Sequence, residues 1–446
     1  MKVHQTDFSK GNVYRNIIEV SLPMTLAQLL NLLYNIVDRM YIGRIPGAGA
    51  TALTGVGICF PVITMIAAFT YLFGNGGSPL CAMELGRGNH EEAEKLMGNT
   101  FSMLLISSVI LMAVSYLFYK PILYAFGASD VTFPYAGDYI KIYLIGTPFV
   151  MISLGLNPFI NCQGFGNMGM MTVLIGAVLN IILDPFMISI LHMGAAGAAI
   201  ATTIGNILAS AYYLWYFMKK SPNFSILPKY FSLENRLASM ICSCGFPTAI
   251  FSVLMSLSTI ILNQILVAYG NAPVAAIGIV FKANMFITFL QMGLANGVQP
   301  LLGYNFGSGD TKRFHGVESY TKKCCLIVGV LATALFFIFR RPILRMFIND
   351  EEVIRYGIKM LIAYMISGPF IGILFTNMNC MQSAGKALPA TILSVLRQGV
   401  LLIPVLYLLN GLLGLNGVIY GQALTDCITV LLSIVFWRKL SHNLYA

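Results

Sequence analysis

Charged side chains are scarce in this sequence: Asp, Glu, Lys and Arg together make up 10% of its 446 residues. Soluble domains carry about 25% charged residues, so the composition excludes a soluble multi-domain enzyme. Hydrophobic residues reach 57% and the mean hydropathy is +0.77. The composition therefore predicts an all-α integral membrane protein that crosses the lipid bilayer many times.

Patterned histidine and cysteine are also lacking. The five histidines lie in tails or loops, and the sequence has neither an HExxH motif nor a Ser–His pairing at a matching depth. A membrane enzyme acting on lipids is therefore disfavoured, and we assign no catalytic residue and expect no cofactor. The nine cysteines fit neither a zinc site nor a disulfide framework, and we interpret them as small packing residues.

The net charge of +10 does not indicate nucleic acid, because no basic run alternates with aromatic residues in a solvated domain. It fits loops that obey the positive-inside rule. The segments predicted to be cytoplasmic hold sixteen Lys and Arg residues and the external ones nine. We therefore expect a multi-pass protein of the plasma (inner) membrane with both termini in the cytoplasm, acting as a monomer.

Twelve apolar stretches are long enough to cross a hydrocarbon core of roughly 30 Å. We predict spans at residues 15–42, 51–75, 96–118, 133–156, 168–191, 194–217, 237–268, 274–298, 318–339, 354–378, 388–409 and 415–437.

The chain also repeats itself. The run Asn75–Leu80, followed by Gly86 and Gly88, recurs as Asn296–Leu301 with Gly307 and Gly309, displaced by 221 residues. Pro121 and Pro342, and Pro148 and Pro369, keep the same displacement. Because each half holds six spans, the halves are parallel repeats. We predict two six-helix lobes related by a pseudo-twofold axis along the membrane normal: residues 1–218, a cytoplasmic loop 219–236, and residues 237–446.

The first span carries one polar stripe, at helical steps of three and four residues, that ends in a carboxylate. Its members are Gln28, Asn31, Tyr34, Asn35 and Asp38. An acid within a membrane span is costly to bury and indicates function.

Several motifs together resemble the multidrug and toxic compound extrusion (MATE) family over essentially the whole chain. They are Pro23 and Asp38 in span one, the duplicated Asn-Gly-x-x-Pro-Leu loops after spans two and eight, the Gln163–Gly166 motif, and Asn180-x-x-x-Asp184-Pro185 in span five. The resemblance implies a secondary antiporter that expels amphipathic, often cationic drugs or toxins, driven by Na⁺ or H⁺. It implies an ion site in the first lobe, as in the DinF-like and MepA-like rather than the NorM-like branches. Tyr34, Tyr139 and Asn157 match family positions and are candidate hydrogen-bond donors around this site. Asn157 precedes Pro158 and could instead satisfy a broken turn.

Depth along the spans points to the same site. Asp38 should lie roughly 7–8 Å, Asp184 roughly 10 Å and Thr202 about 12 Å below the outer ends of their spans, with Asn180 one turn below Asp184. Two carboxylates, an amide and a hydroxyl form an oxygen set that suits Na⁺ or a shared proton. Pro185 and the turn at Gly194–Gly197 could add freed backbone carbonyls. Alternatively, Asp38 could be solvated beside Arg39, Asp184 could only cap a kink, and Asn180 and Thr202 could hold helices together.

Three charges of the second lobe lie far from the ends of their spans, Lys282, Arg397 and Asp426, and spans seven and ten contain no carboxylate. Either Asp426 pairs with one of the cations, or Lys282 or Arg397 lies on the wall of a cleft between the lobes. Soft and polar side chains of spans expected to border that cleft could line it: Gln28, Asn31, Phe149, Met151, Ser256, Thr259, Asn263, Phe286, Phe289 and Met292. Cations in the cleft would favour a flippase for an anionic lipid-linked precursor, whereas the paired acids favour the efflux antiporter.

Overall fold

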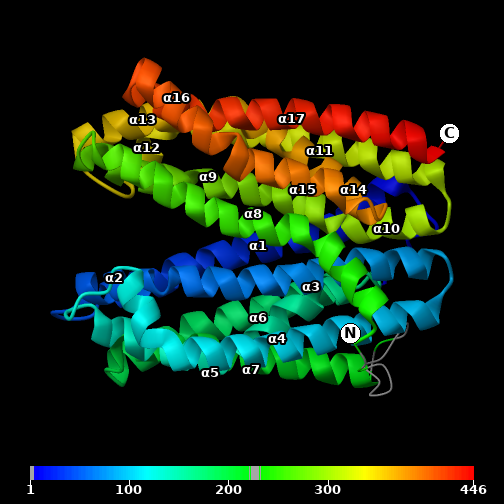
Figure 1. Ribbon diagram of the computed structural model, residues 1–446, viewed down its shortest axis with the longest axis horizontal. Helices are drawn as coiled ribbons and strands as arrows, with labels where there is room; N and C mark the ends of the chain where they lie inside the picture. The colour runs from blue at the N-terminus through cyan, green and yellow to red at the C-terminus, as the bar shows by residue number, and fades with distance from the viewer. Residues whose placement is uncertain (1–4, 220, 222–230, 232, 446) are drawn as a thin grey trace. The chain divides into compact units, whose positions relative to one another are not determined.

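The computed structural model describes residues 5–219, 221, 231 and 233–445, and within these ranges it contains helices and no strand (Figure 1). The first half contains α1 (Val13–Gly43), α2 (Gly49–Ile58), α3 (Phe60–Gly86), α4 (His90–Ala125), α5 (Phe133–Asn161), α6 (Gly166–Pro185), the π-helical turn η1 (Phe186–Ile190) and α7 (Gly194–Lys219). The second contains α8 (Asn235–Val267), α9 (Asn271–Gly297), α10 (Gln299–Gly307), α11 (Thr311–Ile338), α12 (Arg340–Arg345), α13 (Glu351–Ser367), the 3₁₀ turn η3 (Gly368–Phe370), α14 (Ile371–Ser383), α15 (Ala387–Val395), the π-helical turn η4 (Leu396–Val400), α16 (Leu402–Leu413) and α17 (Leu415–Tyr445).

Twelve helical stretches in the described residues are long and apolar enough to span a membrane, which confirms the predicted all-α fold class. The second span differs from its prediction. It begins at Phe60 rather than at residue 51, because Cys59 and Pro61 separate it from the short helix α2.

The sequence suggested that the duplicated motifs are loops, but most of each motif is helical. Residues 75–86 continue α3 through Pro79, and residues 299–307 form α10 after a break at Val298. Only the last part of each motif makes a turn. Gly88 and Gly309 take positive φ angles of 77° and 74°, and the side chains of the next residues, Asn89 and Asp310, accept hydrogen bonds that cap α4 and α11.

Contacts between residues divide the chain into two compact units. The N-terminal unit comprises residues 1–6 and 26–245, and the C-terminal unit residues 7–25 and 246–446. The predicted boundaries differ from this division in two places. The beginning of α1 packs with the C-terminal unit and the beginning of α8 with the N-terminal unit. Most of the predicted linker 219–236 lies outside the described residues.

Each unit is built around one central span. In the N-terminal unit α5 is the most buried span and packs against α2, α3, α4, α6 and α7. In the C-terminal unit the stretch α13–η3–α14 has this place. It breaks at Pro369, and the buried side chain of Gln291 in α9 satisfies the freed backbone: its amide nitrogen donates to Gly368 O (2.6 Å) and its oxygen accepts from Gly372 N (2.6 Å).

Candidate functional site

Two acids from different helices meet inside the N-terminal unit. Asp38 lies five residues before the end of α1 at Gly43, and Asp184 is the second-last residue of α6. Both side chains are buried, at 9% and 0% exposure. Their carboxyl groups lie near each other. Because Asp38 is buried while Arg39 is exposed, Asp38 is not a solvated acid of the membrane surface.

Asn180 and Thr202 complete this cluster. Asn180 is 2% exposed, lies one turn before Asp184 on α6, and donates through Nδ2 to Oγ1 of Thr202 on α7 at 3.1 Å. Four buried oxygens receive no hydrogen bond: Asp38 Oδ1, Asn180 Oδ1 and both carboxylate oxygens of Asp184. Among the described residues neither acid forms an ion pair. Buried acceptors without donors are costly, and a small cation or a shared proton would satisfy them.

Tyrosine side chains surround the acids. Tyr34 lies one turn before Asp38, and Tyr139 of α5 is 5% exposed and lies near the Asp38 carboxyl group. Tyr139 stacks on Tyr143, with ring centroids 6.1 Å apart. Sequence reasoning missed Tyr143 and Tyr71, which lie near Tyr34. The spacing of four residues from Tyr139 could have indicated Tyr143, whereas nothing in the sequence pairs Tyr71 of α3 with α1.

The polar contacts continue from Thr202 toward the middle of α7. Asn206 donates to Thr202 O at 2.8 Å and accepts from Ser153 Oγ of α5 at 2.8 Å. Sequence reasoning did not single out either residue, although Asn206 lies one turn after Thr202. This second layer of contacts fixes the α5–α7 packing that holds Thr202 beside Asn180.

Asn157 does not surround the acids, contrary to the prediction. Its amide nitrogen donates to Gly169 O (2.9 Å) and to Tyr213 Oη (2.7 Å), and its oxygen accepts from Asn161 (3.1 Å). The 15 residues of α6 between Gly169 and Asp184 span roughly 22 Å at the helical rise. Asn157 therefore belongs to a separate polar cluster, since matching a family position fixes a helix but not the depth of its partners.

The prolines and the stripe on α1 are placed as follows. Pro23 lies two residues before the Thr25–Leu26 boundary of the two units, within an unbroken helix. Pro185 ends α6, and the π-helical turn η1 follows it directly. Along the stripe, Gln28, Asn31 and Tyr34 are half-buried whereas Asn35 is exposed.

In the C-terminal unit Arg397 pairs with Asp426. Arg397 Nε donates to Asp426 Oδ1 at 2.8 Å, and the two residues are 6% and 3% exposed. This decides between the two alternatives for Arg397 in favour of pairing. Lys282 of α9 is exposed.

The residues expected to line a cleft differ in exposure. Met151 of the central helix α5 is completely buried (0% exposed). Phe149 is 37% exposed. The others are half-buried: Ser256, Thr259, Asn263, Phe286, Phe289 and Met292.

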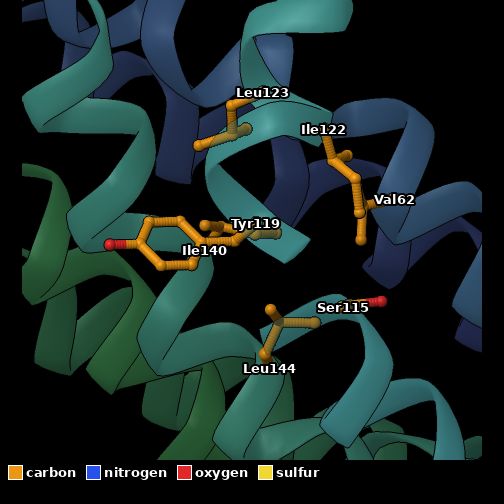
Figure 2. Close-up of a pocket in the computed structure, with 7 residues that line it drawn as sticks. All are labelled: Val62, Ser115, Tyr119, Ile122, Leu123, Ile140 and Leu144. Atoms are coloured by element: carbon orange, nitrogen blue, oxygen red, sulfur yellow. The ribbon is translucent and has the colours of Figure 1, made fainter. Parts of the chain in front are cut away.

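A small apolar gap lies elsewhere in the N-terminal unit, between α3, α4 and α5 (Figure 2). Figure 2 shows the side chains of Val62, Ile122 and Leu144 around it. It has no room for a water molecule, so it is a packing defect rather than a substrate site.

Comparison with known proteins identifies the family. The MatE family model matches residues 23–186 and 247–408, most of both halves. The chain belongs to the MatE (MATE) family. This confirms the resemblance found in the sequence.

The relatives extend over the whole chain. It is similar to the multidrug export proteins MepA of Staphylococcus saprophyticus and Staphylococcus aureus, each 29% identical over 439 residues, or 98% of this chain and 96% of the relative. An outward-facing multidrug resistance MATE family transporter matches with a TM-score of 0.90 at 22% identity, over 100% of this chain and 99% of the other. A MOP superfamily transporter from Pyrococcus furiosus matches with 0.91, also at 22% identity and with the same coverage. At this identity the two structures support the fold alone.

Proposed function

We propose that this chain is a secondary active multidrug efflux antiporter that exports amphipathic, mostly cationic compounds in exchange for H⁺ or Na⁺ by alternating access. Asp38, Asp184, Asn180 and Thr202 would hold the coupling ion. The observation that carries the proposal is the set of four buried oxygens in this cluster that receive no hydrogen bond. Membership of the MatE family and similarity to proteins named multidrug export protein support the substrate class.

The chemistry of the cluster explains how it could couple two fluxes. Both carboxylates cannot stay charged side by side in a medium of low dielectric without a counter-charge. One bound Na⁺ or H⁺ halves the negative charge of the two carboxylates, and the emptied cluster carries a charge cost that favours rebinding. A step that releases the ion on one side and loads it on the other would drive the cycle in one direction.

The alternative function, a flippase for an anionic lipid-linked precursor, rests on cations within the spans. Asp426 neutralises Arg397. The structure therefore supports the flippase alternative less than the sequence alone did. Lys282 alone then remains in its support. We place the protein in the plasma membrane, with cytoplasmic termini, from the distribution of Lys and Arg.

The test uses purified protein in liposomes loaded with a cationic dye, under separately imposed Na⁺ and pH gradients. We expect Asp38→Asn and Asp184→Asn each to abolish ion-driven dye export while the protein stays folded, because the amide cannot carry the charge that the ion neutralises. Asp138→Asn, on the exposed side of α5, is the matched control and should export normally. Undiminished export by Asp38→Asn or Asp184→Asn would contradict the proposal. The gradient that drives the unmodified protein identifies the ion.

A further inference from the structure

The C-terminal unit has a buried carboxylate of its own, with its oxygens fully engaged. Asp426 Oδ1 accepts from Arg397 Nε (2.8 Å) and from Gln422 Nε2 (3.0 Å), and Oδ2 accepts from Ser367 Oγ (3.2 Å). In the N-terminal unit, by contrast, neither oxygen of Asp184 receives a hydrogen bond. The two units thus treat a buried acid in opposite ways. One leaves its oxygens free, whereas the other supplies a fixed cation.

The arginine lies beside two aromatic rings, and its Nη1 atom is buried without a hydrogen-bond partner among the described residues. Arg397 lies in the π-helical turn η4 in the middle of a span, where the widened turn directs it inward. Its guanidinium carbon lies 5.4 Å from the ring centre of Phe251 and 5.3 Å from that of Phe375. These aromatic faces favour a cation at this point. Arg397 is 6% exposed, so water offers the charge no alternative.

A buried ion pair of this kind is weak evidence for stability. Removing two charges from water costs about as much as their attraction returns, and well-packed apolar residues often serve as well. In some proteins such a pair instead specifies one particular structural or binding state. In this pair Arg397 occupies the position beside Asp426 that another cation would need.

We propose that Arg397 is a built-in cation that occupies the carboxylate of the C-terminal unit, so that this unit binds no coupling ion and the N-terminal unit alone sets the number of ions exchanged per cycle. The inference rests on the proposed function for the meaning of coupling. The cation-binding consequence below can be measured without transport.

Removing the guanidinium should uncover a second cation site. The oxygens left around the vacated position are those of Asp426 and the hydroxyls of Ser367 and Tyr364. The Tyr364 hydroxyl is buried, has no hydrogen-bond partner and lies near the ion pair. This is an oxygen set of the kind that binds Na⁺ or holds a proton. The titratable groups facing Asp426 in the described residues are Arg397, Tyr364 and Cys427.

The experiment compares Arg397→Met, which keeps length but not charge, with Arg397→Lys, which keeps the charge. Both are made in the full chain, and both are repeated with Asp38→Asn and Asp184→Asn present. Binding of ²²Na⁺ to purified protein, and proton uptake with a pH-sensitive dye, count the cations taken up. The dye gradient that just balances the ion gradient gives the number exchanged per cycle.

We expect Arg397→Met to bind one more cation per protein than the parent, also when both N-terminal acids are replaced, and Arg397→Lys to bind no more. Adding Asp426→Asn to Arg397→Met should remove the gain. If Arg397→Met stays folded without a gain, the proposal is overturned. If it folds only in high Na⁺ or at low pH, a cation replaces the arginine and the proposal is supported. If it folds only together with Asp426→Asn in every salt, the pair is structural and the proposal fails.

These outcomes are separable from those of the proposed function. If Asp38 and Asp184 do not form the coupling site, the Asp38→Asn and Asp184→Asn variants will export dye as the parent does. The gain at Asp426 is counted in a background that lacks both acids. One result can therefore fail without the other.

Discussion

Gly76 of α3 lies directly against the backbone of Ile241 in α8: a Cβ atom on Gly76 would be 2.2 Å from the Ile241 carbonyl oxygen. The contact recurs in the C-terminal unit, where a Cβ on Gly297 would be 3.0 Å from Val20 O and 2.5 Å from Ser21 Cα of α1. Gly297 follows Gly76 by 221 residues, and Ile241 follows Val20 by 221 residues. Each duplicated glycine thus allows close packing of a helix start within its own unit. Gly76 packs against the start of α8, and Gly297 packs against the start of α1.

This contact predicts that Gly76→Ala and Gly297→Ala destabilise the protein. In a helix alanine is favoured over glycine by about 0.5–1 kcal/mol, but the methyl group would have to displace backbone atoms, which costs about 1–3 kcal/mol. We expect a lower thermal midpoint for both variants, measured by loss of the monodisperse peak of purified protein after heating.

The controls for this prediction are Gly176→Ala in α6 and Gly278→Ala in α9. A Cβ at either position would meet nothing within 4 Å. Both variants should be neutral or slightly more stable. If Gly76→Ala is as stable as Gly176→Ala, the prediction is wrong, because α3 and α8 can then move apart at little cost.

A second prediction concerns the polar cluster that contains Asn157. Tyr213 is 1% exposed, and its hydroxyl bonds to Asn157 and to Thr172. Tyr213→Phe should lower stability by about 1–2 kcal/mol, because two buried polar groups each lose a partner. It should leave the affinity for the coupling cation unchanged, since the cluster is far from Asp38 and Asp184 along α6.

Thr202→Val should weaken cation binding, because it removes a hydroxyl oxygen of the cluster. It should also lower stability by about 1–2 kcal/mol, because the buried Asn180 Nδ2 loses its acceptor. Tyr212→Phe is the control for Tyr213→Phe, because the hydrogen bond that the structure shows for the Tyr212 hydroxyl goes to the sulfur of Met168, at 3.8 Å. Cation titrations and heating curves on the same preparations separate the two effects. Weakened cation binding by Tyr213→Phe would mean that the two clusters act as one.

Much of this architecture could be predicted from the sequence, because hydropathy and a 221-residue repeat report on it directly. The number of spans and the juxtaposition of Asp38 with Asp184 follow from segment length and rise per residue. The helical state of residues 75–80 could not be predicted. Two glycines and a proline usually indicate a loop. In the helix, Gly76 lies against Ile241 and Gly77 against Thr100 and Phe159, and these close approaches explain the two glycines.

Partners of single side chains were also out of reach. Asn157 and Asn180 are both polar residues within spans, and nothing in their local sequence separates the one that joins Tyr213 from the one that joins Thr202. The same holds for Arg397. The sequence offered Asp426 as its possible partner, but it did not indicate that Phe251 and Phe375 lie beside the pair. Such assignments depend on how helices are rotated against each other.

The last prediction concerns residues 7–12, which precede α1 and are hydrogen bonded to α11. Arg313 donates to the carbonyls of Phe8 (2.9 Å), Lys10 (2.6 Å) and Gly11 (3.0 Å), and the Phe8 ring is 5% exposed in a cluster with Phe314 and Trp437. Replacing Arg313 by Ala removes three hydrogen bonds of about 1 kcal/mol each, so amide exchange in residues 7–12 should accelerate at least about tenfold.

Because this opening is local, the global thermal midpoint of Arg313→Ala should stay close to that of the parent. Arg313→Lys should recover only part of the protection, since an ammonium group cannot reach three carbonyls in one plane as the guanidinium does. Lys312→Ala, which removes the adjacent exposed charge, controls for electrostatics and should exchange like the parent. Equal acceleration in Lys312→Ala would mean that net positive charge, and not the three directed hydrogen bonds, holds the segment on α11.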